Sequence, residues 1–206
     1  YKIQIVNSTD REKREKYVKH LYKKLQREGQ LERDVDRLVR NDRIAWGASM
    51  IACKDADAMV TGNIRHYAAS VEKLKKVTEP RPGEEIFGMT MITLKGKTIL
   101  VADTNVQDFP SPQRLVKVSK SCVRVARLFG FDPKVAFLSH STFGKPISRN
   151  TKHVRDAIEL LKTEKVDFDF DGEMQPDVAL NPIYQDIYPF SKIVGNANIL
   201  IMPALH

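Results

Sequence analysis

Hydrophobic and polar positions divide the chain into stretches of helical and strand-like character. In residues 10–28, apolar side chains recur at the i, i+3, i+4 and i+7 spacing of a helix with one buried face: Val18, Leu21, Tyr22 and Leu25. The same kind of pattern predicts three further helices, over residues 31–39, 42–52 and 66–77. Weak alternation over residues 2–6 and a short apolar run over residues 58–61 predict two strands.

The second half of the chain alternates more regularly between strands and helices. Residues 86–94 and 98–103 predict a hairpin, and residues 167–171 and 198–203 predict two further strands. Ser111 followed by Pro112 marks a helix start, because proline fits the first position of a helix. This alternation predicts an α/β fold with a largely parallel sheet.

The most informative stretch joins a buried strand to a loop rich in hydroxyl groups. Five apolar or small residues, 135–139, lead into the loop, and an amphipathic helix begins near residue 150. Strand, loop and helix in this order expose backbone N–H groups and a helix N-terminus, which attract anions. We therefore expect a phosphate-bearing or acyl ligand over this loop, with four lining residues: Ser139, Ser141, Thr142 and Gly144. The alternative is a simple turn whose hydroxyls cap the helix.

Three charged residues follow other predicted strands and could lie beside this loop. Asp171 and Glu173 close the strand at 167–171, and the carboxyl ends of strands are where α/β proteins bind ligands. Arg65 follows the strand at 58–61 in the same way and is a candidate phosphate contact. The alternatives are helix caps for the two carboxylates and a solvated position for the arginine.

Residues 79–83, with two prolines and one glycine, form the clearest break in the chain. Such a segment continues neither a helix nor a strand. We expect a domain boundary here, between residues 1–83 and residues 84–206.

Composition and charge exclude several classes of function. The chain has 206 residues and a net charge of +8, of which +5 lies in residues 1–40, interleaved with acids at helical spacing. No nucleic-acid signature accompanies this charge, and no apolar run approaches the ~20 residues of a membrane span. Two isolated cysteines favour a reducing cytoplasm, and the five histidines have no metal-ligand spacing. We expect no nucleic-acid partner, no membrane and no metal in this chain.

Five segments together resemble the phosphate acetyltransferase (phosphotransacetylase) family, in collinear order over essentially the whole chain. They are ILVADT at 99–104, FDPKV at 131–135, SHSTFG at 139–144, DGEM at 171–174 and GNANILIMP at 195–203. The resemblance implies two α/β/α layered domains with a ligand cleft between them, similar to the isocitrate dehydrogenase architecture. The break at 79–83 fits the implied junction, with an incomplete first domain at 1–83.

Further motifs are most similar to the C-terminal domain of hybrid NADP-dependent malic enzymes: RNDR at 40–43, ADAMVTG at 56–62, Phe143-Gly144 and Met174. This resemblance implies acetyl-CoA as effector or substrate, with phosphate as the other candidate ligand. It also implies an upstream malic-enzyme domain of the same polypeptide that holds NADP and a divalent metal. Homo-dimers or larger homo-oligomers are implied as well.

Two departures from the catalytic pattern bear on activity. Where active transacetylases carry phosphate-binding arginines, this sequence has Leu25 and Glu72, with Lys73 beside the latter. Leucine cannot replace the bidentate guanidinium fork. The family's Ser-Arg pair and catalytic Asp would lie beyond residue 206, so no catalytic residue is assigned.

Three hypotheses remain. The favoured one is a regulatory module that binds acetyl-CoA and alters the conversion of malate to pyruvate elsewhere in the polypeptide. The second is an active phosphate acetyltransferase, and the third is a dimerisation domain with an empty cleft.

Overall fold

The computed structural model describes residues 3–62, 64–104, 109–145 and 151–204. The chain consists of two compact units, Tyr1–Arg81 (unit 1) and Pro82–His206 (unit 2). The division falls inside the 79–83 segment, where the prolines and the glycine prevent regular structure.

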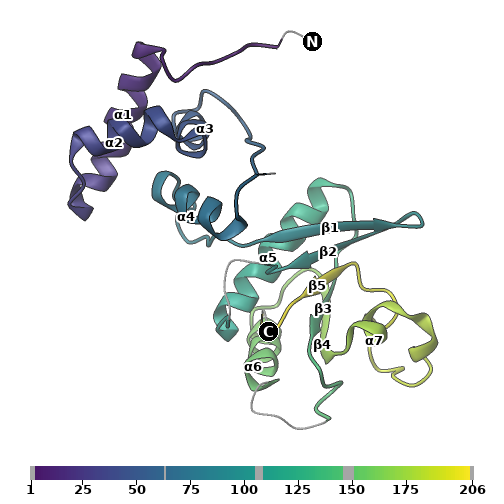
Figure 1. Ribbon diagram of the computed structural model, residues 1–206. Helices are drawn as coiled ribbons and strands as arrows, with labels where there is room; N and C mark the ends of the chain where they lie inside the picture. The colour runs from purple at the N-terminus through teal and green to yellow at the C-terminus, as the bar shows by residue number, and fades with distance from the viewer. Residues whose placement is uncertain (1–2, 63, 105–108, 146–150, 205–206) are drawn as a thin grey trace. The chain divides into compact units, whose positions relative to one another are not determined.

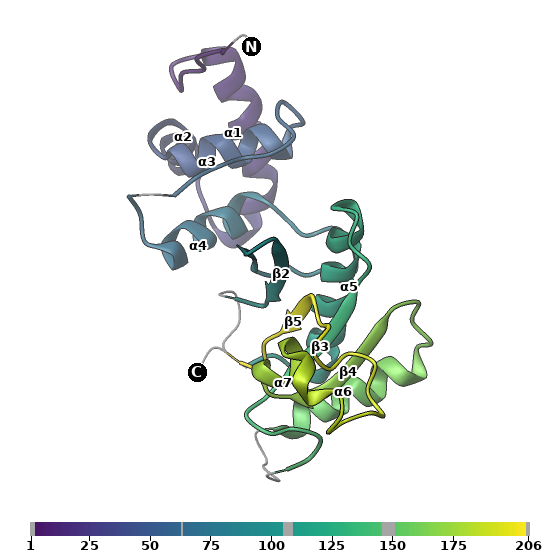
Figure 2. The ribbon, with the colours of Figure 1, turned by 90° about the vertical axis from the view of Figure 1, so that its right-hand side faces the viewer.

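Unit 1 is built from helices that follow the predicted apolar spacing. They are α1 (Arg11–Leu25) with the 3₁₀ turn η1 (Gln26–Glu28), α2 (Glu32–Asn41), α3 (Arg43–Ala52) and α4 (Tyr67–Val77). Asp10 caps α1 by accepting the amide of Lys13, and Asp42 caps α3. Helix α2 packs on α1, and α4 packs on α3 (Figures 1 and 2). All four predicted helices are therefore confirmed.

The core of unit 1 collects the apolar faces of these helices. Val18, Leu21 and Leu25 of the predicted stripe on α1 are buried, together with Tyr17, which the stripe omitted. The Tyr17 ring meets Trp46 edge-on, with ring centroids 4.9 Å apart. Its hydroxyl donates to Asp55 at 2.8 Å, so the polar end of this buried side chain has a partner.

The two strands predicted for unit 1 are wrong. Residues 3–6 and 58–61 are irregular, and the part of unit 1 that the structure describes contains no strand. The side chains of Ile3, Ile5 and Val60 are exposed instead of buried. A short apolar run forms a strand only beside a pairing partner, and none is present among these residues. Among the described residues of unit 1, helices are therefore the only regular structure.

Unit 2 contains a five-stranded mixed sheet. Its strands are β1 (Met89–Leu94), β2 (Lys97–Ala102), β3 (Lys134–Leu138), β4 (Asp169–Met174) and β5 (Ile199–Ile201), in the order β1-β2-β5-β3-β4. Only β1 runs antiparallel to its neighbour, through the predicted hairpin. The prediction of an α/β fold with a mostly parallel sheet is confirmed.

Helices cover both faces of this sheet (Figure 1). On one face lie α5 (Pro112–Leu128), which begins at the predicted Ser111 cap, and α6 (Lys152–Thr163). The other face is covered by α7 (Pro176–Leu180), with the short η3 (Pro182–Tyr184) following it. Helix α7 has only five residues, too few for a periodic pattern that would predict it.

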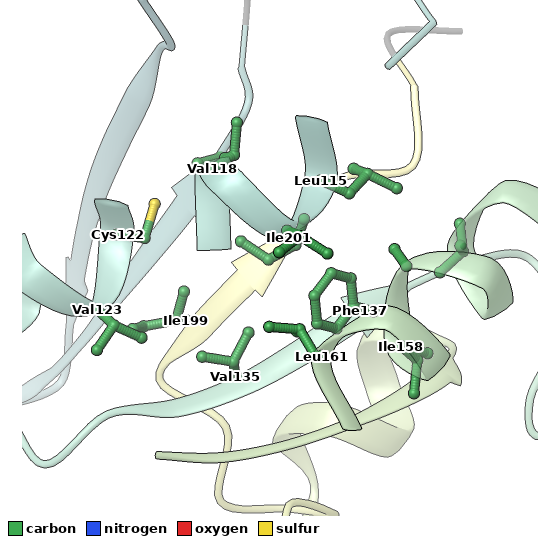
Figure 3. Packing of buried hydrophobic residues seen from close by; sticks show 14 of the residues in the cluster. Leu115, Val118, Cys122, Val123, Val135, Phe137, Ile158, Leu161, Ile199 and Ile201 are labelled. Atoms are coloured by element: carbon green, nitrogen blue, oxygen red, sulfur yellow. The ribbon is translucent and has the colours of Figure 1, made fainter. Parts of the chain in front are cut away.

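The strands alternate between these two layers. Val135 and Phe137 of β3 face α5 and α6, whereas Ala136 and Leu138 face α7. Figure 3 shows Phe137 among apolar side chains of α5, α6 and β5. Because both faces of β3 are covered, the strand is apolar from Val135 to Leu138, as expected of the centre of a parallel sheet.

The parallel strands place their carboxyl ends at one edge of the sheet. At this edge β4 gains one residue relative to β3, between Phe137 and Leu138, so that Leu138 pairs with Met174. The shift depends on Gly172, whose φ is +147° and where a Cβ would lie 2.6 Å from the Phe137 carbonyl oxygen. It brings Glu173 alongside the loop that follows β3. No helix among the described residues is long and apolar enough to span a membrane.

Candidate functional site

The loop at 139–144 leaves β3 as a tight turn at the carboxyl edge of the sheet. Its first amide, that of Ser139, still donates to the Met174 carbonyl at 3.0 Å, as a continuation of the strand. Thr142 and Lys145 then exchange backbone hydrogen bonds of 3.0 and 3.2 Å, which close the turn. Phe143 and Gly144 between them both have positive φ, +48° and +88°. A closed turn of this kind fixes the direction of its amides.

A buried carboxylate, Glu173, lies beneath this turn. Its Oε1 accepts the hydroxyl of Ser141 at 2.7 Å and the amide of Gly144 at 3.2 Å. Its backbone carbonyl accepts the amide of Phe143 at 2.7 Å. Ser139 joins the network through its hydroxyl, 3.2 Å from that of Ser141. Glu173 is only 1% exposed, so these bonds replace its lost hydration.

The structure thus brings together five of the seven predicted site residues: Ser139, Ser141, Thr142, Gly144 and Glu173. These residues were expected to point toward a ligand over the loop. Two of their donors, the Ser141 hydroxyl and the Gly144 amide, point to Glu173 instead. Thr142 accepts the amide of Gln175 at 3.2 Å through its Oγ1.

Asp171 is not at the strand end where the sequence analysis placed it. Strand β4 continues to Met174, and Asp171 pairs with Ala136 in its interior. Its carboxylate accepts the amide of the adjacent Gly172 at 2.9 Å. The predicted strand end was too early because the alternation of Phe168 and Phe170 with aspartates gave no sign of the following buried residues.

Arg65 belongs to unit 1, where it pairs with Asp42 at 2.9 Å. Lys73 binds the same carboxylate oxygen, and the amides of Ile44 and Ala45 donate to the other. Burial raises the pKa of Asp42, but the hydrogen bonds from these cations and amides outweigh it and lower the pKa to about 2. Arg65, the predicted phosphate contact, thus forms an ion pair in unit 1 and does not belong to the loop network of unit 2.

Arg155 on α6 is a site residue that the sequence analysis missed. Its Nε lies 3.6 Å from Oε2 of Glu173, and its side chain is 36% exposed. Gly144 adjoins it, since a Cβ built there would be 3.7 Å from Nη1 of Arg155. The available signal was its position near the start of the helix that follows the loop, next to the buried Val154.

Aromatic side chains form one wall of the turn. Phe143 packs against Tyr188 and Phe190, with ring centroids 5.2 and 4.8 Å apart. Phe190 is 67% exposed, so the wall presents apolar surface to solvent. Tyr188 and Phe190 lie after η3, in a segment without regular structure, and no periodicity in the sequence marks them.

The two positions of the expected arginines lie in unit 1. Leu25 is buried at the end of α1 and lines a cleft of about 470 Å³ in which Glu28 and Asp34 lie with Arg37. Glu72 is exposed on α4. Among the residues that the structure describes, no group of three or more His, Cys, Asp or Glu could hold a metal ion.

The sequence of this chain is similar to those of several known proteins. The curated relatives include the NADP-dependent malic enzyme of Rhizobium meliloti, 43% identical over 99% of this chain and 27% of that protein. The phosphate acetyltransferase of Nitratidesulfovibrio vulgaris is 27% identical over 99% of the chain and 29% of its own length. The chain therefore spans between a quarter and a third of the length of these relatives.

Solved structures agree in fold. A phosphotransacetylase from Streptococcus pyogenes superposes with a TM-score of 0.80 at 28% identity, covering 92% of this chain and 59% of that one. The family description "Phosphate acetyl/butaryl transferase" matches residues 1–206. The loop, the buried glutamate and the parallel sheet edge are thus features of a chain that belongs to the phosphate acetyl/butaryl transferase family.

Proposed function

We propose that this chain is the phosphotransacetylase-like domain of a hybrid NADP-dependent malic enzyme and that it binds acetyl-CoA as a regulatory module. The regulated reaction is the oxidative decarboxylation of malate to pyruvate in an upstream domain of the same cytoplasmic polypeptide, which also holds NADP and a divalent metal. The similarity to malic enzymes over about 27% of their length supports this assignment.

The observation that carries the proposal is the loss of the cations that phosphate chemistry requires. Transfer of an acetyl group to phosphate needs positive charge on the phosphate as the transition state forms. Leu25 is a buried core residue, and Glu72 brings a negative charge. Lys73 next to it is paired with Asp42. Neither position supplies the guanidinium fork that binds phosphate through two parallel hydrogen bonds.

Binding of a thioester, by contrast, does not depend on those positions. The loop at 139–144 keeps its shape through Glu173, and the aromatic wall of Phe143, Tyr188 and Phe190 provides apolar surface beside it. Small-molecule sites are mostly apolar, with a few polar groups in fixed positions. A site of this kind suits a ligand that is held and not converted.

Regulation requires that acetyl-CoA bind one state of the assembly more tightly than another, because an effector shifts an equilibrium only by its differential affinity. Homo-dimers or larger homo-oligomers of the polypeptide would supply these states.

The second candidate, an active phosphate acetyltransferase, is favoured by relatives of that name at 27% identity. A coupled assay for acetyl phosphate on the purified full-length protein separates the two. We expect acetyl-CoA binding by calorimetry and no acetyl phosphate above background. Formation of acetyl phosphate at an enzyme-like rate contradicts the proposal.

The ligand site is tested by changing Ser141 and Thr142 to alanine in the full-length protein. We expect weaker acetyl-CoA binding, while malate turnover without effector survives. Unchanged acetyl-CoA affinity in this double variant shows that the site is elsewhere.

A further inference from the structure

The side chain of Glu173 is one of the largest that the structure buries completely, and its two oxygens have different surroundings. Oε1 accepts two hydrogen bonds, from Ser141 and Gly144. Oε2 has no hydrogen-bond partner in the described part of the chain, although it is fully buried. A buried carboxylate oxygen without a donor is unfavourable unless a charge lies close to it.

That charge is the guanidinium of Arg155, whose Nε lies 3.6 Å from Oε2. The two side chains differ in exposure: the carboxylate is sealed, whereas the Arg155 side chain is 36% exposed. The pair therefore runs from the interior of unit 2 to the surface of the loop. A guanidinium carries five N–H donors in a planar fork, so one such side chain can contact more than one group.

The guanidinium lies against the loop at Gly144, where a Cβ would be in ordinary contact with Nη1 of Arg155, at 3.7 Å. The φ of Gly144, +88°, suits glycine. Because the amide of Gly144 and the hydroxyl of Ser141 point to Glu173, they are not the anion-binding donors of this site. Arg155 is a cation from another element, α6, that adjoins the same turn.

We propose that Arg155 binds the phosphate groups of the CoA ligand, and that Glu173 is the positioning residue that holds Arg155 against the loop at 139–144. The inference rests on the proposed function, since it names the residue that recognises the charged part of that ligand. Guanidinium groups recognise phosphate through paired hydrogen bonds, which fits this role.

The test compares two thioesters on the full-length protein by calorimetry. Acetyl-CoA carries phosphate groups, whereas S-acetylpantetheine has the same thioester without them. We expect Arg155→Ala to weaken acetyl-CoA binding at least tenfold and to change S-acetylpantetheine binding less than twofold. Lys162→Ala is the matched control, because it removes a positive charge from the same helix at a side chain paired with Glu159. It should leave both affinities unchanged.

The positioning role is tested by Glu173→Gln. The amide oxygen of glutamine still accepts hydrogen bonds from Ser141 and Gly144, so the loop is retained while the charge facing Arg155 is removed. We expect acetyl-CoA binding to weaken about threefold in the wild-type background and to change no further in the Arg155→Ala background. A role in loop shape alone would weaken both thioesters equally, in both backgrounds.

Four results overturn the inference. Wild-type acetyl-CoA affinity in Arg155→Ala would do so and leave the proposed function intact. Equal loss of both thioesters would do so as well, since it shows damage to the fold. Loss of inorganic phosphate binding alone would assign Arg155 to free phosphate. Absence of acetyl-CoA binding to the wild-type protein removes both the inference and the proposed function.

Discussion

Asp42 in unit 1 and Glu173 in unit 2 are both buried carboxylates, but their surroundings differ. Asp42 receives two backbone amides on one oxygen and two cations on the other, so each oxygen is fully engaged. Glu173 receives two donors on Oε1 and only an ion pair of 3.6 Å on Oε2. The first arrangement is typical of a helix cap. In the second, the hydrogen bonds engage only one oxygen of Glu173, and the charge near the other oxygen is that of Arg155.

This difference leads to different expectations for the two units. The cations around Asp42, Arg65 and Lys73, are held by a carboxylate that also caps α3. The cation beside Glu173 reaches solvent next to the loop. We therefore expect changes at Asp42 to affect the stability of unit 1, and changes at Glu173 to affect both stability and ligand binding.

The largest effect is expected from Glu173→Ala. This change leaves Ser141, Gly144 and Arg155 without the carboxylate and opens a cavity beneath the turn, at a cost of about 3 kcal/mol. Hydrogen exchange measured by mass spectrometry should show faster exchange in β3 and β4. Peptides of unit 1 serve as the internal control, and unchanged exchange in both strands would refute the role of Glu173 in the fold.

Asp42→Ala should have the next largest effect, about 2 kcal/mol, because α3 loses its cap and two cations lose their partner. Faster exchange is expected in α3 and α4 of unit 1. The matched variant is Asp10→Ala, which removes the exposed cap of α1 and should cost less. Equal losses for the two variants would mean that the cations around Asp42 contribute nothing.

Acid should weaken unit 1 through the same residue. The pKa of Asp42 in the folded chain, about 2, lies below its ordinary value of 3.8. The carboxylate therefore stabilises the fold above pH 4, and this contribution, about 2 kcal/mol, is lost as the pH falls from about 4 toward 2. In urea unfolding, the difference between the wild type and Asp42→Asn should shrink over this range. A constant difference would show that Asp42 titrates normally.

Ser141→Ala removes one hydrogen bond to Glu173 and should cost about 1 kcal/mol in unit 2. Thermal unfolding of the full-length variant measures this loss. Ser139→Ala removes two longer contacts, with the hydroxyl and the amide of Ser141 at 3.2 and 3.3 Å, and is the control, with a smaller expected loss. A larger loss of stability for Ser139→Ala than for Ser141→Ala would show that the bond from Ser141 to Glu173 is not the stronger contact.

The smallest effect concerns the cysteines. Burial raises the pKa of Cys122 in α5 to about 12, and burial also raises the pKa of the half-buried Cys53 in unit 1. Iodoacetamide at pH 8 should therefore modify native Cys53 slowly and Cys122 hardly at all. Faster modification of Cys122 would indicate that unit 2 opens more readily than unit 1.

Much of the fold could be predicted from local patterns. The four helices of unit 1, the hairpin of β1 and β2, and the Ser111 cap all depend on spacing or on turn residues within one segment. The strands expected at residues 2–6 and 58–61 failed because a strand depends on a distant partner, which four or five residues do not encode.

The position of the site could be predicted from the sequence, but the direction in which its side chains and amides point could not. Parallel strand order places Glu173 next to the loop, as expected, yet only the register shift at Gly172 determines that its side chain is buried under the turn. Arg155 was missed because its role follows from the packing of α6 and not from a motif. The prediction placed Asp171 at the end of its strand, but β4 continues to Met174 and Asp171 pairs with Ala136 in its interior.

The most direct test of the account is the rate of malate-dependent NADPH formation by the full-length protein as acetyl-CoA is added. We predict a saturable change in this rate, reduced by Arg155→Ala and unaffected by Lys162→Ala. A rate that is independent of acetyl-CoA in the wild-type protein would contradict the account.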